Sequence, residues 1–96
     1  MDKTVARAQL DAFIEKLRKR TYSELCELLD KPQCEEVRAP DGKSYQIEFE
    51  AFWDESRKAG GNLRVIASVD DGTFLASVHP MSDSFIMAPD GSFVGE

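Results

Sequence analysis

The side chains best suited to catalysis in this sequence are a single histidine and the serines and cysteines that could act with it. His79 is the only histidine, so a nucleophilic dyad would have to pair it with a hydroxyl or a thiol. No nucleophile-elbow motif surrounds His79, and it precedes Pro80 in a short segment between two apolar stretches. We therefore interpret His79 as a loop residue. The sequence predicts no catalytic residue and favours a protein that is not an enzyme.

The cysteines and acids are not spaced as metal ligands. A zinc site needs four cysteine or histidine ligands, or three plus water, whereas this chain has two cysteines, Cys26 and Cys34, and one histidine. No acidic run has the D-x-D-x-D-G spacing of a calcium loop. Glu48 and Glu50 could share one face of a strand, as a general acid–base pair requires, but this spacing is also typical of a solvated sheet face. The sequence therefore predicts no metal and no cofactor.

The composition is that of one small globular domain. The chain has 96 residues, of which 42% are hydrophobic and 31% are charged, so we expect a single domain over residues 1–96. A net charge of −6 repels phosphate backbones and argues against nucleic acid as a partner. No apolar run approaches the ~20 residues that cross a bilayer, so no membrane association is expected. With few cysteines and no apolar signal segment, we expect a cytoplasmic protein.

The first third of the chain has helical periodicity. Its apolar residues fall at i, i+3, i+4 and i+7 and predict an amphipathic helix; they are Leu10, Phe13, Ile14 and Leu17. Thr21 and Glu24 have the spacing of a capping box, which predicts the start of a second, short helix. Pro32 is expected to end it. The cations that follow the first stripe lie where a helix dipole favours them, which accounts for Lys16, Arg18, Lys19 and Arg20 without a nucleic-acid role.

From residue 35 onward the apolar period changes to two, which predicts an antiparallel sheet with one buried face. The tetrapeptide Ala-Pro-Asp-Gly occurs at residues 39–42 and again at 88–91. If each copy is a three-residue hairpin loop with glycine in the left-handed conformation, Val37 lies opposite Tyr45 and Met87 lies opposite Phe93. We therefore interpret the repeat as one turn geometry used twice.

A third Asp-Gly, at residues 71–72, is expected to form a two-residue hairpin loop that sets Val69 opposite Phe74. Three hairpins of this kind give about six strands. The predicted fold is thus α+β: two N-terminal helices packed on one face of a mostly antiparallel, meandering sheet of about six strands.

Two features could carry function. Trp53 continues the inward alternation of Tyr45, so it either caps the core or lines a pocket between helices and sheet, for which we name Tyr45, Trp53 and His79 as candidates. On the opposite face, apolar side chains gather that the helices cannot cover, which indicates either a partner surface or simple strand propensity. The candidates for this surface are Phe52, Ile66, Leu75, Ile86 and Val94.

The sequence therefore favours a binding protein over a catalyst. The first hypothesis is a non-enzymatic protein-interaction module or homo-oligomer, with a protein partner or a second copy bound at the outer face of the sheet. The alternative is a small-molecule-binding domain or weak enzyme whose pocket lies near Trp53.

Overall fold

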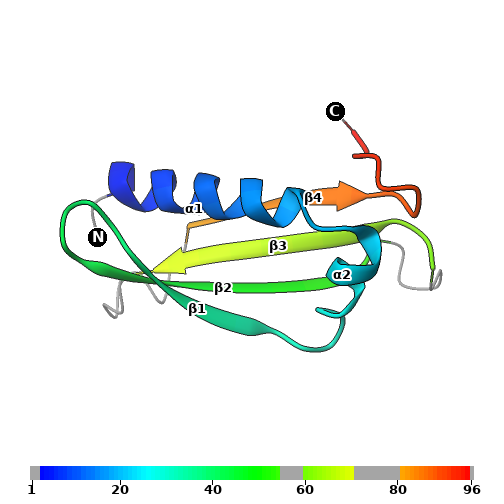
Figure 1. Ribbon diagram of the computed structural model, residues 1–96, viewed down its shortest axis with the longest axis horizontal. Helices are drawn as coiled ribbons and strands as arrows, with labels where there is room; N and C mark the ends of the chain where they lie inside the picture. The colour runs from blue at the N-terminus through cyan, green and yellow to red at the C-terminus, as the bar shows by residue number, and fades with distance from the viewer. Residues whose placement is uncertain (1–2, 55–59, 71–80, 96) are drawn as a thin grey trace.

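In the computed structural model, the helices come first in the chain and the strands follow them (Figure 1). The structure describes residues 3–54, 60–70 and 81–95. The described elements, in chain order, are α1 (Lys3–Arg18), α2 (Tyr22–Cys26), β1 (Gln33–Arg38), β2 (Ser44–Trp53), β3 (Leu63–Asp70) and β4 (Met81–Met87). The fold is α+β, as predicted. Neither described helix has the length and apolar composition that a bilayer crossing requires.

The strands form an antiparallel meander in which each strand pairs with the next, in the order β1-β2-β3-β4. The predicted number of about six strands is wrong, because the described residues form a four-stranded sheet. The hairpin predicted at residues 71–72 is also wrong in its register. Val69 lies opposite Met81, whereas the expected partner, Phe74, lies outside the described residues.

The error has a physical cause in β4. This strand begins at Met81, earlier than its apolar alternation indicates, because Ser82, Asp83 and Ser84 look like loop residues in the sequence. Asp83 stands on the helix side of the sheet, where Arg7 of α1 donates a hydrogen bond to it at 2.8 Å. An ion pair thus replaces an apolar contact at this position. The longer β4 occupies the edge of β3 that the predicted hairpin would have used.

Both Ala-Pro-Asp-Gly turns have the predicted geometry. Val37 lies opposite Tyr45, and Met87 forms a bridge with Phe93. Each turn closes with the same two backbone hydrogen bonds. In the first, the Ala39 N–H donates to the Lys43 carbonyl and the Gly42 N–H donates to the Ala39 carbonyl. In the second, the Ala88 N–H donates to the Ser92 carbonyl and the Gly91 N–H donates to the Ala88 carbonyl. In each turn the aspartate carboxylate also accepts the backbone N–H two residues further on. The repeat is therefore one turn geometry used twice, as expected.

The core lies between α1 and the sheet. The apolar stripe of α1 is buried as predicted, and its contacts run mainly to β3 and β4 (Figure 1). The Phe13 ring packs against Phe49 of β2, with ring centroids 4.9 Å apart. Alternate residues of β2 and β3 complete the inner face; the fully buried large side chains on these strands are Tyr45, Ile47, Leu63, Val65 and Val69.

The two turns give a test of the backbone argument. Gly42 and Gly91 have φ of +84° and +89°, and an added Cβ would meet no atom within 4 Å at either site. We expect Gly91→Ala to lower the free energy of unfolding by about 1 kcal/mol, because only the left-handed backbone disfavours the methyl group. Gly91→Asn should lower it less, because asparagine tolerates this conformation. Urea denaturation measures both, and equal losses in the two variants would contradict the explanation.

Candidate functional site

The structure does not bring together the two predicted pocket residues that it describes, Tyr45 and Trp53. Tyr45 and Trp53 share the inner face of β2 but lie near its opposite ends, about 26 Å apart at the rise of a strand. Tyr45 is fully buried, and its hydroxyl donates to the Asp41 carboxylate at 3.0 Å. Trp53 is half-buried against the core, opposite Leu63. His79 lies outside the described residues.

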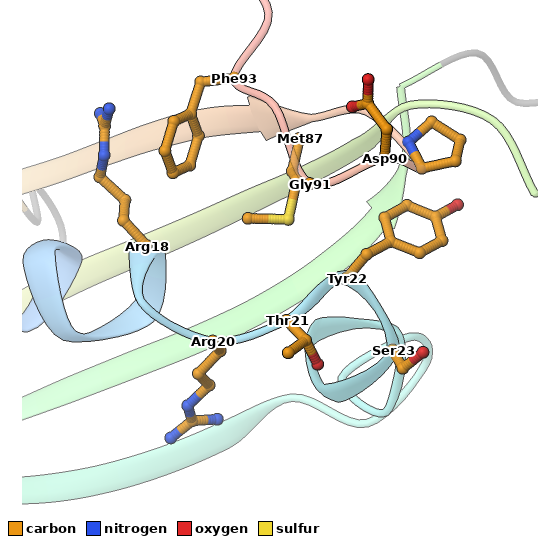
Figure 2. Close-up of a pocket in the computed structure, with 10 residues that line it drawn as sticks. Arg18, Arg20, Thr21, Tyr22, Ser23, Met87, Asp90, Gly91 and Phe93 are labelled. Carbon is orange, nitrogen blue, oxygen red and sulfur yellow. The ribbon is translucent and has the colours of Figure 1, made fainter.

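A pocket of about 430 Å³ lies elsewhere, where the junction of α1 and α2 meets the turn after β4 (Figure 2). Its apolar lining comes from Met87 and Phe93, and polar side chains surround them. The described lining residues are Arg18, Arg20, Thr21, Tyr22, Ser23, Met87, Pro89, Asp90, Gly91 and Phe93. Because these residues come from both ends of the chain, the pocket depends on the packing of α1 against β4.

The arginines of this pocket rest on aromatic rings. The Arg18 guanidinium lies 4.0 Å from the centre of the Phe93 ring, which itself meets Phe85 edge-on at 5.8 Å. Such stacking attracts the cation to the negative face of the ring. Arg20 lies 5.8 Å from the ring centre of Phe49, and in Figure 2 its side chain extends away from Phe93. Two of the four basic residues predicted at the helix end, Arg18 and Arg20, thus lie against aromatic rings of the core.

The start of α2 is held by the predicted capping box. The Thr21 hydroxyl accepts the backbone N–H of Glu24 at 3.1 Å, and the Glu24 carboxylate accepts the N–H of Thr21 at 2.9 Å. The hydrogen bond that the Thr21 backbone N–H donates to the carboxylate stabilises its charged form and lowers the pKa of Glu24. The Tyr22 hydroxyl donates to the Gly61 carbonyl at 2.6 Å. Burial, together with the nearby Cys26 thiol, raises the pKa of Tyr22.

The opposite rim of the pocket carries Asp90. Its carboxylate accepts hydrogen bonds from the Ser92 hydroxyl at 2.6 Å and the Ser92 backbone N–H at 2.9 Å, which lower the pKa of Asp90. Among the lining residues that the structure describes, Asp90 is the one carboxylate, and none is a histidine or cysteine.

The second candidate site is the sheet face turned away from the helices. We define the outer patch as four apolar residues on this face: Phe52, Ile66, Ile86 and Val94. Phe52 of β2 and Ile86 of β4 lie on either side of Arg64 of β3, in one row across the sheet. The Val94 backbone N–H donates to the Ile86 carbonyl at 2.9 Å and extends that row. Phe52 and Val94 are 39% and 38% exposed, the largest exposures of any large apolar side chains described. Leu75, the fifth candidate, lies outside the described residues.

Arg64 lies inside the outer patch, between Phe52 and Ile86. Its Nε and Nη2 atoms donate to the same carboxylate oxygen of Asp54, at 3.2 and 3.0 Å. This ion pair fixes the guanidinium and supplies its countercharge from the same chain. Arg64 is therefore a polar group within the patch whose charge is already paired with Asp54.

The remainder of the outer face is acidic. Glu50 lies directly opposite Ile66, and Glu48, the next residue of β2 on the same face, lies opposite Ser68. Across the described strands and the residue after β2, the outer face carries five acids and two bases. They are Glu36, Glu48, Glu50, Asp54 and Asp70, against Arg38 and Arg64. Sequence analysis found the apolar members of this face but missed its charge asymmetry, which the alternation of strand residues already contains.

The comparisons with protein-family models, with curated proteins and with solved structures found no match to this chain. Within residues 3–54, 60–70 and 81–95, no group of three or more histidine, cysteine, aspartate or glutamate side chains is placed to hold a metal ion. Any function must therefore be inferred from the pocket and the outer face themselves.

The pocket rim generates a pH prediction. We expect the Asp90 carboxyl to titrate at lower pH than an ordinary aspartate, and Ser92→Ala to return its midpoint toward the usual value, because both a hydroxyl donor and local order are lost. The stabilisation linked to this group is present above the pKa of the unfolded chain and is lost as pH falls through the lowered folded pKa. Carboxyl carbon NMR shifts measure the midpoint. An unchanged midpoint in Ser92→Ala would show that the hydrogen bond from the Ser92 hydroxyl does not set it.

Proposed function

We propose that this protein is a protein-interaction module that binds its partner through the outer patch. The observation that carries the proposal is the gathering of Phe52, Ile66, Ile86 and Val94 at one end of an otherwise polar sheet face. The described helices lie on the opposite face (Figure 1). Strand alternation places Phe52, Ile66 and Ile86 on the side away from α1, and the Val94 backbone continues their row from Ile86.

Strand propensity alone is a weaker explanation. A β-branched residue on a solvated strand is common, but propensity does not account for four apolar residues in two adjacent register rows with exposed serines and glutamates nearby. It also fails for Phe52, which leaves 39% of its surface exposed at the end of β2. Exposed apolar surface that is contiguous and rimmed by polar residues is typical of interaction sites.

Small-molecule binding is the second candidate function, and the pocket between α1, α2 and the turn after β4 supports it. Its volume of about 430 Å³ lies in the range of ligand sites. It is not the Trp53 pocket expected from the sequence. A ligand there should shift the NMR signals of Met87 and Phe93, while leaving those of Phe52 and Ile66 unchanged.

The proposed function can be tested by site-specific photo-crosslinking in cells that produce the full chain. We place a photoreactive phenylalanine analogue at Phe52 and, as a matched control, at exposed Glu15 of α1. Position 52 should yield a discrete protein conjugate that position 15 does not. Because binding requires an intact patch, excess wild-type protein should compete for the partner and lower the yield of that conjugate. An Ile66→Asp variant with unchanged circular dichroism should not lower it.

Two results would count against the proposal. One is the same set of conjugates from positions 52 and 15, which would indicate random collision. The other is equal competition by wild-type protein and Ile66→Asp, which would show that the partner does not contact the outer patch.

A further inference from the structure

The outer patch is too small to be an interface by itself. A stable interface removes about 800 Å² of surface from each partner, which four partly exposed side chains do not supply. Any footprint of that size on this face must extend along β2 and β3 from Ile66. The next side chains in that direction are Glu50, directly opposite Ile66, and Glu48 in the following row. Both glutamates are exposed.

A partner that covers Glu48 and Glu50 must compensate their charges. A carboxylate that loses water without gaining a cation or hydrogen-bond donors is strongly destabilised, and complementary charge is what sets partner choice at such a rim. The chain itself supplies little compensation on this face. Arg64 is bound to Asp54, and Arg38, the other cation of the described outer face, lies at the far end of β1, opposite Ser44.

A second copy of the chain does not meet this requirement. A two-fold dimer buries the same surface on both subunits, so a face whose described residues include five acids and two bases would meet another of the same kind. The apolar residues could pair across the axis, but each added glutamate would bring a second one with it. The charge of the face thus opposes the homodimer that the apolar residues alone would permit.

From this asymmetry we infer that the outer face binds a protein surface with an apolar centre and a surround of lysine or arginine side chains. The inference rests on the proposed function and specifies the partner of that same site. The apolar centre lies on the outer patch, and the surrounding cations pair with Glu48 and Glu50. The acidic surround repels nucleic acid and anionic lipid, whose charges have the wrong sign.

The test uses the full chain and a synthetic amphipathic helical peptide of leucine and lysine, with leucines at i, i+3, i+4 and i+7. A matched peptide carries glutamate in place of every lysine. Amide NMR shifts should map the lysine peptide to β2, β3 and β4 around Ile66 and Glu50, and the glutamate peptide should not bind. Because the contacts at the rim are ionic, added salt should weaken the complex.

Matched variants separate the outer face from the net charge of the protein. Glu48→Gln with Glu50→Gln should weaken binding of the lysine peptide about fivefold to tenfold, as expected for two exposed ion pairs. Glu15→Gln with Glu27→Gln removes the same charge from exposed positions in α1 and directly after α2 and should weaken it by less than about twofold. Equal weakening in the two double variants would overturn the inference, because binding would then follow net charge alone.

Three further outcomes distinguish this inference from the proposed function. Sedimentation or light scattering that shows a dimer, which Ile66→Asp dissociates, would overturn the cationic partner but leave the outer face as an interface. Lysine-peptide shifts confined to α1 and the pocket, with no change around Ile66, would overturn the inference. Loss of position-specific crosslinking at Phe52 would overturn the proposed function whatever the peptide does.

Discussion

The alternation of side chains along the strands determines both the core and the candidate interface. Successive residues of a strand point to opposite faces, and the described helices cover one face (Figure 1). The register decides which residues receive that cover. At the first turn, Val37 lies opposite Tyr45, so the odd-numbered residues of β2 from Tyr45 to Ala51 are buried and the even-numbered ones are exposed or half-buried. A slip of one residue would bury Glu48 and Glu50 and expose Ile47 and Phe49, at a large cost in free energy.

This constraint also explains which parts of the fold could be predicted from the sequence. The stripe of α1, the Thr21–Glu24 capping box and the two Ala-Pro-Asp-Gly turns are local patterns, and all are confirmed. The pairing of β3 with β4 is not local. It depends on Phe85 and Met87 reaching the inner face opposite Val65 and Leu63, and on the ion pair that lets Asp83 stand within a strand. A nearby Asp-Gly signal was therefore the wrong guide to the partner of β3.

The candidate sites differ in the same way. The members of the outer patch lie on strands whose alternation is visible in the sequence, so four of the five predicted residues can be placed on one face; Leu75 lies outside the described residues. The pocket joins Arg18 and Tyr22 to Met87 and Phe93, and nothing in the local sequence indicates that these segments meet. Its cations were visible as a basic run, but their packing on Phe93 and Phe49 requires the tertiary fold.

The rigidity of the outer face follows from what lies beneath it. The inner residues of β3, among them Leu63, Val65 and Val69, are fully buried, and β3 is paired on both sides. The backbone that carries Arg64 and Ile66 is therefore fixed before any partner arrives, and the Arg64–Asp54 ion pair limits the motion of the largest polar side chain within the patch. A surface ordered in advance loses less conformational entropy on association. A central strand paired on both sides, which presents Ile66 beside the apolar row and directly opposite Glu50, can therefore form a specific contact from a modest apolar area and a few rim charges.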